Sequence, residues 1–382
     1  MPTSARADVG IRPYKFFPQE NVMYLQLIIN PGSTSTKLAL YRGEEKLVQE
    51  DVTHDSGELA KYKDIVDQVP LRMAFIQDFL ARHNVKPEQL HCVMGRGGLL
   101  PGLKAGGYRM NEDLKIALGG DLSSPHASNI GGILAYEIAK PLGIPAYIYD
   151  AVTSAELPHL ARITGMPQVY RNSFCHALNS RAQAIRYAGQ EGKEYKDMRL
   201  IVAHLGGGIS LSVHQDGRIV ETIGDDEGPF SPERAGAIPA LELIKMCFSG
   251  KYTVADMKKM MRGKGGMMAY LGTSDARVIE KMIAEGDEKA KEIYEAQAYQ
   301  VAKGIGLLSA TMKGKVDAVI LTGGMAYSKM LTGWISEYVS YIAPVVVLPG
   351  ENEMEALAFG GLRLLDGKEQ PNIYTLPEGY KV

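Results

Sequence analysis

The sequence contains few cysteines and no long apolar run. Only three of its 382 residues are cysteines (Cys92, Cys175 and Cys247), and they form no CxxC pair. Widely spaced single cysteines are typical of reduced thiols rather than of disulfides or metal ligands, which favours a cytoplasmic location. No apolar stretch approaches the roughly 20 residues that a membrane-spanning helix needs. Residues 1–22 lack the apolar core of a secretory signal, so we expect a tag or a disordered extension there.

The sequence also lacks a large excess of one charge and the common nucleotide-binding fingerprints. Its formal net charge is −2. Proteins dedicated to nucleic acids or membrane surfaces usually carry a basic surplus, so neither partner is expected. The chain contains no GxxxxGK[ST] or GxSxG motif, and no GxGxxG that opens a helix after a strand. A P-loop enzyme, a dinucleotide-binding dehydrogenase and an α/β-hydrolase are therefore disfavoured.

What the sequence does contain is an alternation of apolar strands and amphipathic helices, which indicates an α/β fold. Strands are predicted at 24–30, 37–43, 46–54, 90–95, 145–150 and 316–326, with a ribbon of three strands at 199–222. Helices are predicted at 57–84, at 126–140 and over most of 238–315, and residues 343–365 read as strand, loop and helix. Pro70 can divide the segment 57–84 into two helices.

The strand pattern restarts after Asp150, and the restart resembles the opening of the chain. Asn30 and Gly32 align with His204 and Gly206, which lie 174 residues further on. A chain of this length usually exceeds a single core, so we expect two domains related by duplication. The first is predicted to contain residues 23–150 and about 352–382, and the second residues 151–351.

Three turns of small residues each follow directly after a predicted strand. Their sequences are NPGSTST at 30–36, HLGGGIS at 204–210 and LTGGMA at 321–326. Phosphate oxygens need closely packed N–H and O–H donors, and only small side chains let the backbone approach them. Each turn alone is more typical of an ordinary hairpin. Three of them, two being copies, favour a nucleotide held between the two halves.

These turns resemble those of the superfamily of acetate and sugar kinases, heat-shock chaperone ATPases and actin. Within it, the chain is similar to the acetate kinase family from Met23 to about residue 370. The segments INPGSTSTK, SPHASN, FCHAL, HLGGGIS, ERAG, GTSDAR, LTGG and NE occur in the family's order. The resemblance implies two actin-like (ribonuclease H-like) domains with mixed five-stranded sheets and a nucleotide cleft between them. It also implies ATP or ADP with Mg²⁺, a short-chain carboxylate substrate, and a homodimer or higher homo-oligomer.

The resemblance assigns residues of the first half to metal and phosphate. Asn30 and Glu353 correspond to the groups that hold Mg²⁺ directly or through its waters, and oxygen ligands suit this ion. Ser33, Ser35 and Lys37 would line the first turn. Taken alone, Glu353 is equally typical of a solvated carboxylate at a helix start. Lys37 could also cover the outer face of the hairpin instead of reaching phosphate.

Two arginines and three histidines are assigned to the reacting groups by the same resemblance. Arg96 and Arg234 correspond to a pair of arginines, and guanidinium groups neutralise the charge of a carboxylate that attacks a phosphate. His176 would donate to the transferring phosphoryl group, His204 would contact phosphate, and His126 would lie on the carboxylate side. Without the resemblance, an arginine in a glycine loop is typical of a surface charge and a single histidine of a buried core residue.

The remaining assignments concern Asp150 and the nucleoside. A carboxylic acid with a pKa near that of Glu, about 4.3, is already ionised at neutral pH and needs no general base. Asp150 is therefore expected to position a cation or the water shell of the metal. Asp275 and Arg277 correspond to nucleoside contacts, although a helix cap with a surface charge explains this pair equally well. The second and third turns contribute the phosphate-binding glycines Gly206, Gly207, Gly208, Gly323 and Gly324.

Two departures from the family pattern bear on the substrate. The arginine segment MGRGGLL is shorter than in acetate-specific members, and Gly207 stands where those members carry asparagine. Both point away from acetate itself, and the first is compatible with a longer aliphatic tail, as in butyrate and similar short or branched fatty acids. Overlapping use of neighbouring chain lengths is expected, because one methylene is worth only about 1–3 kcal/mol. Acetate or propionate kinase activity, a sugar kinase with Asp150 as base, and an ATPase of the actin or chaperone type stay open as alternatives. The physiological direction stays undecided.

Overall fold

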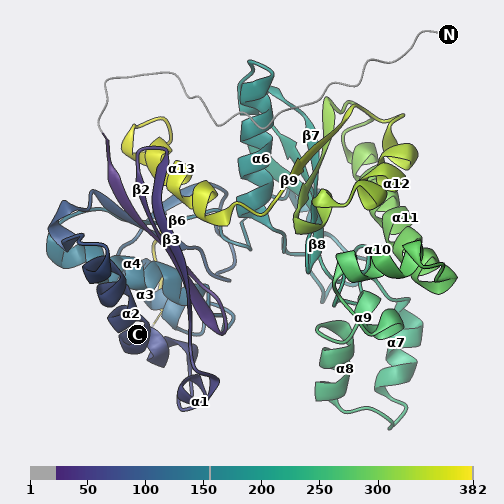
Figure 1. Ribbon diagram of the computed structural model, residues 1–382, viewed down its shortest axis with the longest axis horizontal. Helices are drawn as coiled ribbons and strands as arrows, with labels where there is room; N and C mark the ends of the chain where they lie inside the picture. The colour runs from purple at the N-terminus through teal and green to yellow at the C-terminus, as the bar shows by residue number, and fades with distance from the viewer. Residues whose placement is uncertain (1–22, 155, 381–382) are drawn as a thin grey trace.

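The computed structural model describes residues 23–154 and 156–380. The predicted extension at 1–22 lies outside the described residues. The described chain folds into two α/β halves, each built around one mixed sheet (Figure 1). No helix among the described residues is long and apolar enough to cross a membrane.

The first sheet has the strand order β12-β5-β6-β4-β1-β2-β3. Its strands are β1 (Leu25–Pro31), β2 (Ser35–Arg42), β3 (Glu45–Thr53), β4 (Cys92–Arg96), β5 (Gly107–Arg109), β6 (Ala146–Tyr149) and β12 (Asn372–Ile373). Five of these form the expected mixed sheet, with β1 antiparallel to β2 and parallel to β4. The two short edge strands β5 and β12 extend it to seven, so the expected number of five strands is wrong for this half.

The second sheet has the order β11-β10-β7-β8-β9. Its strands are β7 (Leu200–Leu205), β8 (Ile209–Gln215), β9 (Arg218–Ile223), β10 (Ala318–Gly323) and β11 (Val345–Pro349). The order β6-β4-β1-β2-β3 of the first sheet is thus repeated strand for strand. In both sheets the first hairpin strand is central, antiparallel to the next strand and parallel to a later one. The predicted duplication is confirmed.

Helices cover both faces of the first sheet. They are α1 (Ser56–Leu59), α2 (Val69–Arg82), α3 (Glu112–Gly119), α4 (Asn129–Leu142) and α13 (Glu353–Leu365). Leu27 and Ile29 of β1 pack with α2 and α4, whereas Ile28 packs with α13 on the opposite face. Because both faces are buried, the strand reads as a continuous apolar run. Pro70 lies in the first turn of α2, where proline is tolerated, so it begins this helix and does not interrupt it.

The second half contains more helices, most of them on one face of the sheet. They are α5 (His159–Arg162), α6 (Ala177–Gln190), α7 (Ala240–Cys247), α8 (Val254–Met261), α9 (Gly266–Leu271), α10 (Ala276–Ala284), α11 (Glu288–Thr311) and α12 (Lys329–Val339). Leu200 and Val202 pack with α6, while Ile201 and Ala203 pack with α11 and α12. The helix α6 also packs against α13 of the first half. The chain therefore brings α6 and α13 together between the two sheets (Figure 1).

Candidate active site

Two stacked histidines lie at the meeting point of the two halves. His204 is near the end of β7, and His176 is the residue before the first turn of α6. Their ring centroids are 3.9 Å apart and the rings are almost parallel, with an angle of 8°. Burial lowers the pKa of His204 to about 4 and lowers the pKa of His176 well below its ordinary value. Both imidazoles are therefore neutral at pH 7.

Arg96 and Arg234 approach these histidines from the two halves. Burial is the main cause of the lowered pKa of each histidine, and the positive charges of both arginines lower it further. Both guanidinium groups are therefore close to the stack. Arg96 ends β4 and pairs with Glu353 at 2.5 Å. Arg234 pairs with the buried Asp225 at 2.5 Å. The structure therefore brings together the two arginines that the sequence pairs, each held by a carboxylate.

The second glycine turn is shaped around Arg234. A Cβ atom on Gly208 would lie 2.0 Å from a guanidinium nitrogen of Arg234, so a side chain at position 208 would displace the guanidinium group from its present place. The turn is closed by a hydrogen bond from Gly206 N to Gly208 O, and Ser231 Oγ donates to Gly207 O at 2.7 Å. Gly207 itself is exposed, with open space where a side chain would be. The backbone of this turn is thus accessible beside a fixed positive charge.

Asn30 and Glu353 are adjacent, although 323 residues separate them. Asn30 Nδ2 donates to Glu353 Oε2 at 2.8 Å, which leaves Asn30 Oδ1 without a hydrogen-bond partner among the described residues. Burial opposes the ionisation of Glu353, but the charge of Arg96 and the hydrogen bond from Asn30 outweigh it, so the pKa of Glu353 is lowered. An amide oxygen and an ionised carboxylate are ligands that fit Mg²⁺, which keeps several of its waters in proteins.

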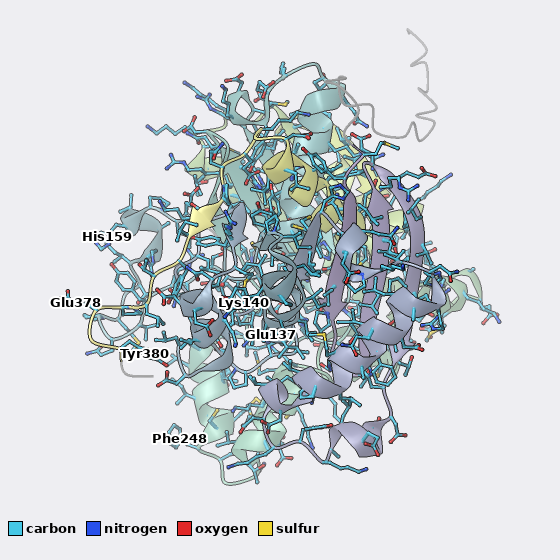
Figure 2. All side chains as sticks on the ribbon, turned by 90° about the vertical axis from the view of Figure 1, so that its left-hand side faces the viewer. Glu137, Lys140, His159, Phe248, Glu378 and Tyr380 are labelled. Carbon is cyan, nitrogen blue, oxygen red and sulfur yellow. The ribbon has the colours of Figure 1, made fainter. Side chains whose placement is uncertain are left out.

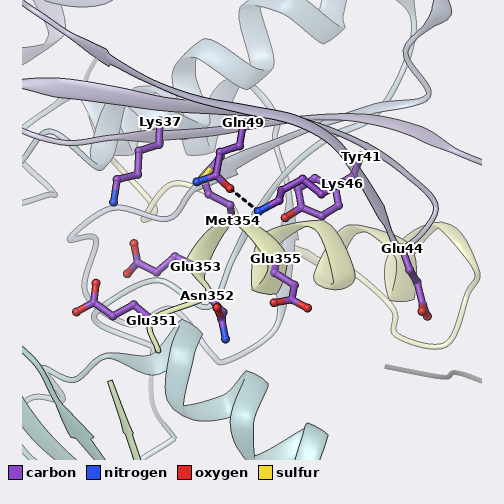
Figure 3. Close-up of a pocket in the computed structure, with 10 residues that line it drawn as sticks. All are labelled: Lys37, Tyr41, Glu44, Lys46, Gln49, Glu351, Asn352, Glu353, Met354 and Glu355. Atoms are coloured by element: carbon purple, nitrogen blue, oxygen red, sulfur yellow. Dashed lines mark hydrogen bonds between the residues drawn. The ribbon is translucent and has the colours of Figure 1, made fainter. Parts of the chain in front are cut away.

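A cavity of about 350 Å³ opens beside this pair, between β2 and the start of α13. Figure 3 shows Lys37 pointing from β2 toward the loop that carries Glu351 and Glu353. Burial and the nearby Glu353 raise the pKa of Glu351, while the ammonium group of Lys37 lowers it. Glu351 also lies 3.9 Å from Nε2 of His204. The loop after β11 therefore borders both glycine turns, and Glu351 is not among the residues expected there from the sequence.

The first turn is held from behind by an arginine that the sequence analysis missed. Gly32 N donates to Ser35 O at 2.8 Å, which closes the turn. Arg72 of α2 is fully buried and donates to the carbonyl oxygens of Ser33 and Ser35 and to Thr36 Oγ1. The side chain of Ser33 is exposed and that of Ser35 is half-buried. Arg72 thus fixes the backbone of the predicted phosphate turn without lying on its exposed side.

Asp150 lies inside the protein and pairs with an arginine of the second half. Asp150 is buried, accepts a hydrogen bond from Gly106 N at 2.6 Å and pairs with Arg181 of α6 at 3.2 Å. Its described contacts do not include Asn30 or Glu353.

At the third turn, a Cβ on Gly323 would lie 2.3 Å from the carbonyl oxygen of Leu205, so this glycine permits the close approach of β10 to β7. The neighbouring Gly324 is exposed, with open space beside it.

Of the remaining predicted residues, His126 lies near two arginines, whereas the described contacts of Asp275 and Arg277 include none with the other site residues. His126 hydrogen-bonds Ser128, and its pKa is lowered by partial burial and by the charges of Arg96 and Arg262, so it lies on the arginine side. Asp275 caps the N-terminus of α10 by accepting from the backbone of Arg277. The side chain of Arg277 is 89% exposed and pairs with Asp275. The described contacts of these two residues are those of a capped helix end.

Comparison with known proteins agrees with this arrangement. Residues 175–331 match the acetokinase family. The chain is 48% identical to butyrate kinase 1 of Clostridium acetobutylicum and 46% identical to a probable butyrate kinase 2 of Caldanaerobacter subterraneus, over 92% of its own length and the full length of each relative. The chain belongs to the acetokinase family. The expected enzyme class, a kinase with a carboxylate acceptor, is confirmed by this membership.

Solved structures of acetokinase-family members share the fold. The acetate kinase of Porphyromonas gingivalis superposes with a TM-score of 0.73 at 19% identity, covering 90% of this chain and all of the other. The acetate kinase of Entamoeba histolytica gives a TM-score of 0.70 at 17% identity, covering 88% and 99%. The predicted fold class is therefore confirmed, apart from the two added edge strands.

Proposed function

We propose that this chain transfers the γ-phosphoryl group of ATP to butyrate and to similar short or branched carboxylates, reversibly and with Mg²⁺. The observation that carries the proposal is the gathering of Arg96, Arg234 and the neutral pair His176 and His204 at one place. The chain is identical at almost half of its aligned positions to relatives named butyrate kinases, which supports butyrate as the substrate within the carboxylate class. The short arginine segment MGRGGLL, which differs from that of acetate-specific members, supports the same choice.

The proposed mechanism is direct in-line transfer. Arg96 and Arg234 neutralise the negative charges that approach each other, and His176 and His204 donate hydrogen bonds to phosphoryl oxygens. Asp150 acts in this proposal by its pair with Arg181, which fixes α6 and thereby the position of His176 just before it. The substrate carboxylate needs no base, because it is already ionised at neutral pH.

Mg²⁺ is proposed to be held by Asn30 and Glu353 and to neutralise charge on the ATP phosphates. The free Oδ1 of Asn30 and the lowered pKa of Glu353 support this assignment. The first turn, with Ser33, Ser35 and Lys37, and the glycines of the second and third turns are proposed to bind the nucleotide phosphates. Asp275 and Arg277 are the proposed nucleoside contacts.

The proposal extends to the assembly of the chain. We propose two domains, residues 23–150 with about 352–382 and residues 151–351, supported by the membership of the two sheets. A homodimer is proposed through α7, which has no buried residue and exposes Leu241 and Ile244, together with the exposed Phe248 that directly follows the helix. Figure 2 shows Phe248 projecting from the surface of the protein. A cytoplasmic location is proposed from the unpaired cysteines.

Trapping of the acyl phosphate with hydroxylamine tests the substrate. With ATP and Mg²⁺, we expect hydroxamate from butyrate, isobutyrate and valerate at higher kcat/KM than from acetate, with propionate in between. Acetate or propionate as the best substrate would move the chain to the alternative acetate or propionate kinase activity. ATP turnover that is indifferent to every acid would instead support an ATPase of the actin or chaperone type.

A further inference from the structure

The two stacked histidines each have one ring nitrogen within hydrogen-bond distance of a described protein group and one that is not, although the carboxylate of Glu351 lies 3.9 Å from Nε2 of His204. Nδ1 of His204 contacts Asn179 Nδ2 at 2.9 Å, and Nδ1 of His176 contacts Ser210 Oγ at 2.8 Å. Neither Nε2 has a hydrogen-bond partner among the described residues. Because a neutral imidazole carries one proton, the partner of Nδ1 decides whether Nε2 is a donor or an acceptor.

The surroundings of Asn179 decide the question for His204. Nδ2 of Asn179 lies within reach of both His204 Nδ1 and Thr322 Oγ1, at 2.9 and 3.2 Å. The Thr322 hydroxyl donates to the carbonyl oxygen of Gly350 at 3.3 Å, so it accepts from Asn179. The amide oxygen of Asn179 is buried without a partner.

Turning the amide over would place its NH₂ group in that position and leave two buried donors unsatisfied. Buried N–H groups without partners are rarer in proteins than buried carbonyl oxygens without partners. The amide orientation with Nδ2 toward His204 is therefore favoured. In this orientation Nδ1 of His204 accepts, and the ring proton is on Nε2.

Ser210 decides the question for His176. Its Oγ accepts from the backbone N–H of His176 at 3.0 Å and contacts Nδ1 of the same residue. Ser210 is 1% exposed, and its hydroxyl has no other acceptor among the described residues. The hydroxyl proton is therefore satisfied only by donation to Nδ1, which again leaves the ring proton on Nε2.

We propose that Asn179 and Ser210 are positioning residues that fix His204 and His176 as Nε2–H tautomers, so that two neutral N–H donors face the transferring phosphoryl group. The identity of the acceptor rests on the proposed function, whereas the tautomers follow from the contacts alone. Nε2 of His204 faces the second turn, since a Cβ on Gly206 would lie 2.9 Å from it. The opposite tautomers would turn lone pairs toward phosphate oxygens, and donors fixed in advance need no reorganisation during the reaction.

Nitrogen-15 NMR of the histidine rings near pH 7 tests the tautomers directly. In the unmodified chain we expect an acceptor-type signal for Nδ1 and a protonated-type signal for Nε2 in both residues. In Asn179→Asp, whose carboxylate can only accept, Nδ1 of His204 should become protonated while His176 is unchanged. In Ser210→Ala, His176 should lose its single tautomer. A protonated Nδ1 in the unmodified chain would overturn the proposal, as would unchanged spectra in both folded variants.

Kinetics then test whether the donors act on the phosphoryl group. Asn179→Leu and Ser210→Ala should lower kcat about 10- to 100-fold, the range found for residues that orient metal-ligating histidines, with a smaller change in KM for ATP. Ser212→Ala is the matched control, because Ser212 lies on the same strand and makes the same kind of contact, Oγ to a ring nitrogen of His214 at 2.9 Å. It should leave kcat unchanged.

The outcomes separate this inference from the proposed function. Altered tautomers with an unchanged kcat would overturn the role of the two donors, even if butyrate proves to be the substrate. If no carboxylate is phosphorylated but the rings show Nε2–H and respond to the substitutions, the proposed function fails and the assignment of tautomers holds. If Asn179→Asp does not fold, Asn179→Leu replaces it, with loss of the single tautomer of His204 as the expected result.

Discussion

The substitution Arg72→Met would remove a positive charge from directly behind the first turn, which is proposed to bind phosphate. The guanidinium group is fully buried and donates to neutral oxygens, those of Gln68, Ser35 and Thr36, each at 2.9 Å. No carboxylate pairs with it among the residues that the structure describes. Burial lowers the pKa of Arg72, yet a guanidinium stays protonated in proteins. Because a buried charge without a counter-charge is costly, we expect the phosphates of ATP to supply the missing charge.

The expected magnitude follows from Coulomb's law. If a phosphate bound on the exposed side of the turn is roughly 8 Å from the guanidinium, opposite unit charges attract by about 2 kcal/mol at an effective dielectric constant near 20. Loss of about 2 kcal/mol weakens ATP binding about 30-fold. In the free protein, Arg72→Met has two opposing effects on the free energy of unfolding. Each buried acceptor that loses its donor destabilises the folded state by about 1–3 kcal/mol, whereas removal of the buried charge stabilises it by a similar amount. The ATP-bound state should therefore lose more stability than the free state.

Calorimetric titration with ATP in the presence of Mg²⁺ measures this effect. We expect Kd to rise about 30-fold in Arg72→Met and much less in Arg72→Lys, which keeps the charge. Arg82→Met is the control, because Arg82 lies on the same helix but is half-exposed and paired with Glu50 and Asp78. Equal losses in the lysine and methionine variants would show that Arg72 acts through backbone geometry. An unchanged Kd in Arg72→Met would refute phosphate binding at the first turn.

Three further predictions concern catalysis, the metal and acid stability. Arg234→Ala should lower kcat at least 10³-fold with little change in KM for ATP, because 10³-fold is the lower bound for an arginine that neutralises a phosphoryl transition state. Arg262→Ala is the control: it also removes a partner of Asp225 but should keep most of the activity. A raised KM for ATP with an unchanged kcat in Arg234→Ala would contradict the assignment. Chelation of Mg²⁺ should abolish hydroxamate formation, and Glu353→Gln should require more Mg²⁺ for half-maximal rate, so an unchanged Mg²⁺ requirement would exclude this ligand. Burial lowers the pKa of His214 to about 3. The unfolded chain therefore binds this proton from about pH 6.5 downward while the folded chain does not, and the free energy of unfolding should fall by up to about 5 kcal/mol as the pH drops from 6.5 to 3. Urea titrations of the unmodified chain and of His214→Gln at successive pH values should show a shallower acid decline in the variant.

The fold could be predicted from the sequence where apolar patterns and buried surfaces agree. The three strands at the start of each half and the helices α4 and α11 follow this rule. The helix α6 was not predicted, because Asn179, Ser180 and Arg181 are buried in it and interrupt the apolar period. The edge strands β5 and β12 have only three and two residues, too few for any period to show.

The residues of the candidate site could likewise be predicted from the sequence only in part. Residues near strand ends, such as Asn30 and His204, could be found because the small-residue turns that follow these strands are visible in one sequence. Arg72 and Arg181 could not, because a charged residue within an amphipathic helix ordinarily marks the solvated face. Both are buried, and both fix a backbone segment that carries functional groups. A buried cation can be recognised only when the acceptors around it are known in three dimensions.

The two turns occupy equivalent places in the duplicated sheets but differ in length and in chemistry, with four residues between the paired Pro31 and Thr36 and three between Leu205 and Ile209. Asn30 and His204 occupy equivalent positions, each at the end of a central strand and paired with the next strand of its hairpin. The first presents a free amide oxygen beside an ionised carboxylate, which suits a cation. The second presents an imidazole beside Arg96 and Arg234, which suits an anion. A metal–phosphate complex carries both kinds of charge, so two equal turns would bind only one end of it well. The difference between Asn30 and His204 is thus one of the differences between the turns that would give the proposed site its direction.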